Sequence, residues 1–513
     1  MRDDWLQSSR KFTADVARRE PLNRTTLPIS AYTVSPDAPR FLVCVVLLVA
    51  VGVAGLQASA EDWPKYNRDL ANSAHSSETG INSSNATSLK SKWTLAAGNK
   101  ISATPAVATI NGTSTVFVGS WDGVFRAVNA VTGTLIWSFT VDSVGNCKPH
   151  NCRIGSSAAV DTNTNLVFFG AKNAYLYALD AVAGKLVWKQ QVGNPIVGYE
   201  IWSSPAVYNS VVYVGVASQG DNPCVPGQVR AFAEQTGANV WTFNTINQQT
   251  CPGGGQCVGA GVWSSVAIDD VNGIVYVGTG NPGLTSNPPT QNAGLYADSI
   301  LALNASNGTL LNYYQALKND NGDEDFGSSP VLHSTSETNQ CTKTSTSNYW
   351  VSDAQKNGHV FTVERNAKGL LTGNVFNNTT SRYGMIATPT VRPVEVVTSC
   401  GQGKKIIDDD NYLYAPGVAG SLWTFRQVGT GTIKVLSQNR TSMTTVYGAP
   451  ASIQDIVLFG GVDGNLYVTA QYGKTLTSFP IGAPIFGGIA ISNGRLYFGD
   501  TSGIIHCMSI NGQ

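Results

Sequence analysis

Three side chains in this sequence combine a reactive type with a turn or strand end that could present it to a ligand. Lys356 lies in the K-N-G turn of AQKNGHVFTVER (354–365), just before an alternating segment that predicts a strand. It is either a solvated turn charge or a cation aimed at a bound cofactor. Asn281 lies in the glycine-rich turn GTGNP, where its amide oxygen could serve as a hard ligand for a divalent cation or simply begin an Asn-Pro turn. Trp263, in GVWSSVAI, could offer a flat face for stacking, although packing in a core is the commoner fate of a tryptophan.

Carboxylates occur near these segments. Asp221 lies in GVASQGDNPCVPGQV, and Asp298 lies in ADSILAL. We interpret the acidic stretch NGDEDFGSS (321–329) as a solvated loop, with a place beside a binding site as the alternative, and the run Asp408 to Asp410 as a solvated hairpin. The five histidines show no metal-ligand spacing, and the sequence has no C-x-x-C-H motif for c-type haem.

The overall charge argues against nucleic acid as a partner. The chain has 513 residues, with 33 basic and 33 acidic side chains and a formal net charge of zero, so it lacks the positive field that binding to a phosphate backbone requires. Charged residues make up only 13%, while 53 glycines, 11 tryptophans and 19 tyrosines are typical of an all-β protein with many strands and tight turns.

The N-terminus predicts a targeting segment rather than part of the fold. The apolar run FLVCVVLLVAVGVAGL (41–56) follows a long basic flank and precedes the small-residue pattern ASA (58–60). This arrangement predicts a secretory signal peptide cut near Ala60, because the run is shorter than the roughly 20 residues that a membrane-spanning helix prefers. An uncleaved signal anchor, which would tether the protein to a membrane, is the alternative. Residues 1–60 are thus expected to be the cytoplasmic n-region with the signal, and residues 61–513 the secreted or lumenal fold.

Cysteines and glycosylation motifs agree with export. Eight cysteines follow the apolar run, and an even count in an exported chain predicts disulfides. Cys147 and Cys152, and likewise Cys251 and Cys257, are close enough in sequence to close small loops. Eight N-x-[ST] motifs follow the predicted signal and predict a glycoprotein. They begin at Asn82, Asn85, Asn111, Asn304, Asn307, Asn377, Asn378 and Asn439.

A repeated segment organises the chain from residue 101 onwards. ISATPAV (101–107) is the first of eight copies. The others are IGSSAAV (154–160), IWSSPAV (201–207), VWSSVAI (262–268), FGSSPVL (326–332), MIATPTV (385–391), VYGAPAS (446–452) and IFGGIAI (485–491). Each copy is followed by two or three alternating segments separated by Gly or Asn turns, which predicts antiparallel strands joined by hairpins.

Four strands in each of eight units predict an all-β fold, an eight-bladed β-propeller of four-stranded antiparallel blades. The small residues of the repeated segment suit innermost strands that crowd around a central channel. The last unit stops after its third strand, and SKWTLA (91–96) resembles a fourth strand. We therefore expect this N-terminal strand of the mature chain to complete blade eight and leave no open sheet edge. A β-solenoid or two β-sandwiches are the alternatives, which the irregular spacing and the unbroken repeat disfavour.

The ends of the units carry a family resemblance. YLYALDAVAGKLVW, VFRAVNAVTGTLIW and QVRAFAEQTGANVW resemble the pyrroloquinoline-quinone (PQQ) repeat, which places Trp137, Trp188 and Trp241 at its docking-tryptophan position. Across residues 61–513 the chain resembles quinoprotein alcohol dehydrogenases, most closely the polyvinyl-alcohol dehydrogenase-like group. The resemblance implies PQQ- and Ca²⁺-dependent oxidation of a secondary or polymeric alcohol. Because a haem motif is absent, electrons would leave to an external acceptor.

The resemblance also implies roles for individual residues. Trp263 falls on the tryptophan that stacks under PQQ, Lys356 on the lysine that hydrogen-bonds the quinone, and Asn281 on the asparagine ligand of Ca²⁺. The family's glutamate ligand falls in a loop that here offers only Asp221. The catalytic aspartate of a G-D-N triplet is replaced by Ala293, which leaves Asp298 as the candidate base.

Two departures from the family pattern support a second function. The G-D-N triplet is absent, and so is the vicinal Cys-Cys pair that alcohol quinoproteins often carry, with Cys224 alone near its position. A non-catalytic extracellular propeller that acts as a binding or scaffold module is therefore the alternative, since one fold can host many functions. The enzyme hypothesis requires Lys356, Trp263 and Asn281 to lie at one face, within reach of a single planar ligand.

Overall fold

The computed structural model describes most of the chain after the predicted targeting segment. The described residues are 61–145, 147–220, 224–246, 259–283, 296–318, 320, 322–379, 388, 390–401, 403–417, 421–427, 433–439, 444–470 and 473–513. The predictions on Asp221, on Ala293, on Cys251 and Cys257 and on residues 1–60 fall outside these ranges. Within them, no helix is long and apolar enough to span a membrane.

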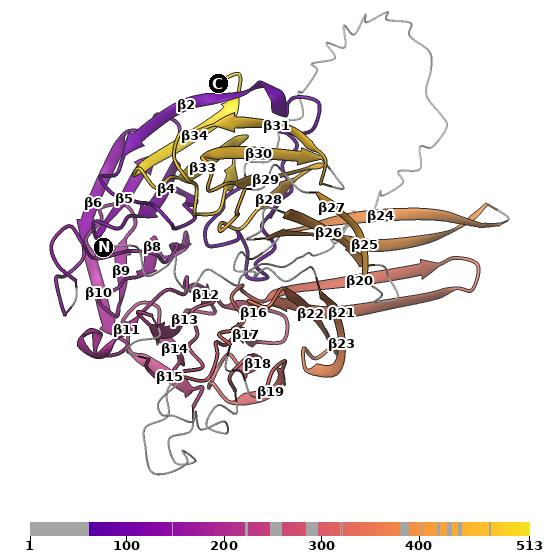
Figure 1. The fold of residues 1–513 in the computed structure, drawn as a ribbon, viewed down its shortest axis with the longest axis horizontal. Helices are drawn as coiled ribbons and strands as arrows, with labels where there is room; N and C mark the ends of the chain where they lie inside the picture. The colour runs from indigo at the N-terminus through magenta and orange to yellow at the C-terminus, as the bar shows by residue number, and fades with distance from the viewer. Residues whose placement is uncertain are drawn as a thin grey trace, which may run out of the picture.

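The strands follow the order of the sequence repeat, and we call each repeat unit a blade (Figure 1). Blades one and two contain β3 (Ala106–Ile110), β4 (Thr113–Gly119), β5 (Val124–Asn129), β6 (Leu135–Thr140), β7 (Ala159–Asp161), β8 (Leu166–Gly170), β9 (Tyr175–Asp180) and β10 (Leu186–Gln191). Blades three and four contain β12 (Ala206–Tyr208), β13 (Val211–Ser218), β14 (Gln228–Ala233), β15 (Asn239–Asn244), β16 (Ala267–Asp269), β17 (Ile274–Gly278), β18 (Ser299–Asn304) and β19 (Leu310–Gln315).

The remaining blades show the same order. Blades five and six contain β20 (Val331–Asn339), β21 (Thr344–Ala354), β22 (His359–Arg365), β23 (Leu371–Thr379), β24 (Thr390–Gly401), β25 (Lys404–Gly417), β26 (Ser421–Gln427) and β27 (Ile433–Asn439). Blades seven and eight contain β28 (Ala451–Ile453), β29 (Ile456–Gly460), β30 (Asn465–Ala470), β31 (Thr475–Pro480), β32 (Ala490–Ser492), β33 (Arg495–Gly499), β34 (Ile504–Ile510) and β2 (Leu89–Ala96). Short elements complete the set: β1 (His75–Ser76), β11 (Tyr199–Glu200) and the 3-10 helices at Ala86–Ser88 and Pro195–Val197.

Neighbouring strands within each blade pair antiparallel, which confirms the predicted all-β architecture of four-stranded sheets. The early strand β2 pairs antiparallel with β34, with Trp93 opposite Cys507, so it becomes the fourth strand beside the last three of the chain. This is the pairing expected for SKWTLA.

Tryptophans at the ends of four blades each bond the following blade. Trp137, Trp188 and Trp241 donate Nε1–H to the carbonyls of Ala181, Glu234 and Ala305 at 3.1, 2.7 and 2.8 Å. Trp93 donates in the same way to Ala130 at 3.0 Å. Each indole covers a turn glycine at positive φ, where a Cβ would come within 2.6 Å of the ring. Docking therefore needs both residues: the tryptophan bonds the next blade, and the glycine of that blade leaves room for the indole ring.

Small side chains link the innermost strands of neighbouring blades. In each of the first five repeated segments, one backbone N–H donates to a hydroxyl of the next blade at 2.8–3.0 Å. The accepting hydroxyls belong to Ser157, Ser204, Ser265, Ser329 and Thr388. In blade eight the N–H of Gly488 donates to Thr104 Oγ1 of blade one at 3.0 Å. The small residues of the repeat thus bond the inner strands to one another.

Residues 63–78, here called the strap, run along the first strands of six blades. In each of the six, the last residue of the repeated segment donates its N–H to a strap carbonyl at 2.7–3.1 Å. The donors are Val107, Val160, Ile268, Leu332, Val391 and Ser452. β1, within the strap, also pairs parallel with β28. The strap therefore ties the blades together through one repeat position.

Two long hairpins, β20–β21 and β24–β25, project from the blades (Figure 1). β20 pairs antiparallel with β25, which joins blades five and six in one eight-stranded sheet. A disulfide between Cys341 and Cys400 links the two hairpins covalently. The prediction of a solvated hairpin at Asp408 to Asp410 is wrong for Asp410, because packing between the strands buries it in an ion pair with Arg426.

Candidate functional site

Four of the predicted site residues lie at the same end of blades four and five. Trp263 precedes β16, Asn281 follows β17, Asp298 precedes β18, and Lys356 occupies the β21–β22 turn. The N–H of Asp298 donates to the carbonyl of Gly280, next to Asn281, at 3.0 Å. Lys356 Nζ lies 5.4 Å from the centre of the Trp263 ring. The structure therefore brings together residues that the sequence placed in four separate segments.

Asp325 connects these residues, although the sequence interpretation treated its loop as solvated. Its carboxylate accepts hydrogen bonds from Trp263 Nε1 at 3.0 Å and from Lys356 Nζ at 2.8 Å. The same carboxylate accepts the backbone N–H of Asn281. Only 5% of Asp325 is exposed, so the solvated-loop interpretation is wrong at this residue. The loop folds back onto the turn after β17, where Gly280 leaves room: a Cβ there would lie 3.1 Å from the carboxylate.

Lys356 is buried rather than solvated, with 4% of the residue exposed. Its ammonium forms ion pairs with Asp323 and Asp325. Burial disfavours the charged form, but the two carboxylates outweigh it and raise the pKa of Lys356 above its usual value. The side chain is therefore a fixed cation at neutral pH, held beside the Trp263 ring.

Asp298 is a fully buried carboxyl, and neither of its oxygens has a hydrogen-bond partner among the described residues. Burial raises the pKa of Asp298 to about 9, with the negative charges of Asp325 and Asp320 adding to the rise and Lys356 opposing it. The carboxyl is therefore protonated at neutral pH in this structure. An unpartnered carboxyl among other carboxylates is a place where a cation would be stabilised.

The oxygen donors at this end suit a hard cation such as Ca²⁺. The amide of Asn281 and the carboxyl of Asp298 belong to segments joined through Gly280, and both are oxygen donors of the type that Ca²⁺ prefers. Across the described ranges, no group of three or more His, Cys, Asp or Glu side chains is arranged to hold a metal ion. Asp221, the other predicted ligand, lies outside those ranges. The donor chemistry thus fits Ca²⁺ at Asn281 and beside Asp298.

A second group of residues, from blades one to three, has the opposite character. Arg153 Cζ lies 3.8 Å from the centre of the Trp202 ring and 5.2 Å from that of Trp121. Buried Glu200 accepts two hydrogen bonds from Arg153, at 3.0 and 2.8 Å. Lys100 Nζ lies 5.1 Å from the centre of the Trp121 ring. Two cations are thus presented against aromatic faces, which favours contact with anionic groups.

Repeat positions place this second group at the same end as Asp325. Trp202 and Trp263 hold the second position of the repeated segment in adjacent blades. Trp121 in GSWDG and Lys356 in AQKNG hold the same position in the turn between the second and third strands. The sequence interpretation missed Arg153, although comparing equivalent repeat positions could have revealed its aromatic neighbours.

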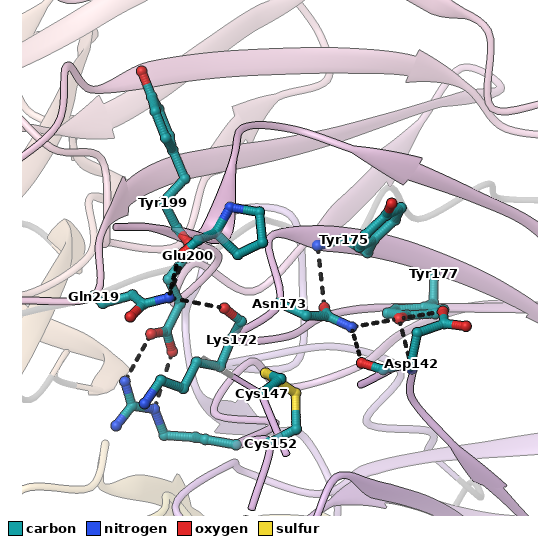
Figure 2. Close-up of a disulfide and its surroundings, with 12 residues drawn as sticks. Asp142, Cys147, Cys152, Lys172, Asn173, Tyr175, Tyr177, Tyr199, Glu200 and Gln219 are labelled. Carbon is teal, nitrogen blue, oxygen red and sulfur yellow. Dashed lines mark hydrogen bonds and ion pairs between the residues drawn. A yellow bond between two sulfur atoms is a disulfide. The ribbon is translucent and has the colours of Figure 1, made fainter. Parts of the chain in front are cut away.

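A disulfide fixes the chain that presents Arg153. Cys147 and Cys152 are bonded, as their spacing predicted, and both are buried. Figure 2 shows Glu200, Lys172 and Gln219 gathered on one side of this disulfide. Gln219 Nε2 donates to the Lys172 carbonyl at 3.4 Å, and the N–H of Lys172 donates to the carbonyl of Arg153 at 2.9 Å. The guanidinium therefore projects from a segment held on both sides.

Known proteins resemble this chain in sequence over roughly half of their length. Quinoprotein alcohol dehydrogenase PedH of Pseudomonas putida is 28% identical over 329 residues, which cover 57% of this chain and 54% of that protein. Polyvinylalcohol dehydrogenase of a Pseudomonas species is 23% identical over 347 residues, 61% of this chain and 51% of that protein. The expected closeness to the polyvinyl-alcohol group is thus weaker than the likeness to PedH.

The fold and a family profile agree. The structure of quinohemoprotein alcohol dehydrogenase ADHIIG from Pseudomonas putida HK5 matches with a TM-score of 0.66 at 18% identity, over 88% of this chain and 80% of that chain. At this identity the match shows the fold alone, a β-propeller. The PQQ profile described as glucose/ethanol/alcohol dehydrogenase, beta-propeller domain, matches residues 63–371. The chain therefore belongs to the PQQ β-propeller family of glucose, ethanol and alcohol dehydrogenases.

Proposed function

We propose that this protein is a secreted, PQQ- and Ca²⁺-dependent alcohol dehydrogenase that oxidises a secondary or polymeric alcohol. One observation carries the proposal: Trp263, Lys356 and Asn281 meet at the Asp325 carboxylate. Asp298 lies beside them with an unpartnered carboxyl. PQQ would supply a two-electron acceptor, and Ca²⁺ an electrophile that polarises it.

The two groups of residues would bind different parts of the cofactor. Trp263 would carry the flat ring system of the cofactor by stacking. Lys356 would donate a hydrogen bond to a quinone oxygen. In the other group, Arg153 is held by Glu200 and Trp202 and would pair with the carboxylates of PQQ.

Asp298 would accept the hydroxyl proton of the alcohol on a carboxylate oxygen. A base must be ionised, whereas burial raises the pKa of Asp298 to about 9 in the cofactor-free protein. Asp298 therefore becomes competent only when a cation, bound by Asn281 with Asp221 as the proposed further ligand, lowers that pKa. This dependence links turnover to cation binding.

A binding or scaffold module without turnover is the second candidate. The replacement of the family's G-D-N triplet by a sequence with Ala293 favours it. To separate the two, the purified chain is loaded with PQQ and Ca²⁺ and dye reduction is followed with a panel of primary, secondary and polymeric alcohols. Reduction supports the enzyme, and cofactor binding without reduction supports the module. An unchanged PQQ absorbance together with an unchanged Tm would show that PQQ does not bind and would contradict the enzyme proposal.

The proposal also covers the electron acceptor, the export of the protein and the closure of the ring of blades. Electrons would pass to an external acceptor, and residues 1–60 would direct export, either cleaved near Ala60 or kept as a signal anchor. The eight repeat units would close into one ring. The pairing of β2 with β34 and the bond from Gly488 to Thr104 support closure.

A further inference from the structure

We propose that Asp325 is a positioning residue that sets the spacing between the stacking ring, the cation and the Asn281 turn. This inference rests on the proposed function, because the pocket so arranged is the one proposed for PQQ. It assigns a specific task to the acidic loop, for which a place beside a binding site was the alternative expectation.

One carboxylate joins three segments of the chain. Asp325 Oδ2 accepts from Trp263 Nε1 at 3.0 Å and pairs with Lys356 Nζ at 2.8 Å. Asp325 Oδ1 accepts the backbone N–H of Asn281. The donors come from the start of blade four, the turn of blade five and the end of β17. Because the two oxygens of a carboxylate are rigidly spaced, their bonds fix the three donors relative to one another.

The backbone that carries this carboxylate is held on both sides. The Asp325 carbonyl accepts the N–H of Lys356 at 2.9 Å, and the N–H of Phe326 donates to the Thr279 carbonyl at 3.2 Å. The Phe326 ring is fully buried. Gly280 lies against the carboxylate, so no larger residue fits there without moving it. Asp325 therefore acts from a fixed place rather than following its partners.

Asp323 offers a matched comparison, because its carboxylate pairs with the same ammonium. The Asp323 side chain is 28% exposed, against 7% for Asp325. Removing either carboxylate lowers the local negative charge by the same amount. Asp325 also bonds Trp263 and Asn281, so a positioning role for Asp325 predicts unequal effects, and a purely electrostatic role predicts similar ones.

The test compares Asp325→Asn with Asp323→Asn in the full chain. The dissociation constant for PQQ is measured by absorbance titration in the presence of Ca²⁺, and kcat and KM are measured with the best alcohol. We expect Asp325→Asn to weaken PQQ binding at least tenfold and to lower kcat, while Asp323→Asn changes PQQ binding less than threefold. Equal effects of the two substitutions would mean that charge alone matters and would overturn the positioning role.

A second variant keeps the inference testable if Asp325→Asn does not fold. Trp263→Phe keeps a ring but removes the N–H that Asp325 accepts. It should weaken PQQ binding in the wild-type chain. Where Asp325→Asn folds, Trp263→Phe should add little in that chain, because the two changes break the same bond. Wild-type affinity in Trp263→Phe overturns the inference.

The failure of the proposed function would look different. If the wild-type chain binds no PQQ, the proposed function is wrong, and the positioning role is then measured on the cofactor-free protein. Asp325→Asn should alter the near-ultraviolet circular dichroism of the tryptophans, and Asp323→Asn should leave it unchanged. Identical spectra for the three proteins would contradict the role of Asp325.

Discussion

Two groups of residues at the same end of the blades hold charge in opposite ways. On the side of blades one to three, Arg153 lies against aromatic rings and pairs with one buried carboxylate, Glu200. On the side of blades four and five, Lys356 pairs with two carboxylates, and the carboxyl of Asp298 lies nearby without a partner. The first side presents a compensated cation to a ligand, and the second has more acid than base. The group around Arg153 therefore suits an anionic ligand group, and the group around Asp298 suits a cation.

Glu200 and Asp298 are both completely buried, but their charged neighbours differ. Burial raises the pKa of each carboxyl. At Glu200 the guanidinium of Arg153 opposes the rise and bonds both oxygens. At Asp298 the neighbouring carboxylates add to it. The basic side is thus complete in itself, and the acidic side is completed only by a bound cation.

Asp298→Asn is the change with the largest expected effect, because it removes the proposed base. We expect kcat of the loaded enzyme to fall about 10²- to 10⁴-fold, with PQQ still bound. The measurement is steady-state dye reduction alongside a PQQ titration. Asp180→Asn, on a blade turn outside the pocket, is the control. A kcat within threefold of wild type would assign the base to another residue.

Lys356→Met tests whether the acidic side depends on the cation that pairs with Asp323 and Asp325. It leaves Asp323 and Asp325 facing each other without a positive charge, and losing one partner of a buried pair costs about 3–5 kcal/mol of stability. We expect a lower Tm and no measurable PQQ binding. Lys343→Met, at the exposed hairpin turn after β20, changes the same charge outside the pocket and should have little effect. Should both variants melt at the wild-type temperature, the Lys356 ion pairs contribute nothing to stability.

The same contrast explains what could be predicted from sequence. Trp263, Asn281 and Lys356 lie in short motifs that resemble segments of the quinoprotein family residue by residue. The internal repeat predicted the four-stranded sheets, and its resemblance to the PQQ repeat predicted the docking tryptophans. Asp325 could not be placed, because its contact with Trp263 spans 62 residues and its loop has no periodicity. The strap was missed for a related reason: it bonds through backbone carbonyls, which leave no side-chain pattern.

The pH dependence of stability tests whether the acidic side is incomplete without a cation. The pKa of Asp298 is raised from 3.8 to about 9, so the folded protein holds a proton that the unfolded chain releases. Stability of the cofactor-free protein should therefore fall as pH rises from about 4 to about 9, by at most roughly 1.4 kcal/mol per pH unit. Asp298→Asn should lack this contribution. The advantage of the variant in Tm over wild type should grow with pH, and parallel curves for the two proteins would show that Asp298 does not titrate as proposed.

Arg153→Lys carries the smallest expected effect and tests the basic side. Lysine keeps the charge but cannot bond both oxygens of Glu200 or stack on Trp202 as a planar guanidinium does. We expect PQQ affinity to fall roughly three- to tenfold, in line with the loss of about one hydrogen bond, while the pH dependence of stability assigned to Asp298 stays unchanged. If Arg153→Lys also shifted the pH profile, the two sides would be electrostatically coupled, and the basic side could no longer be treated as complete in itself.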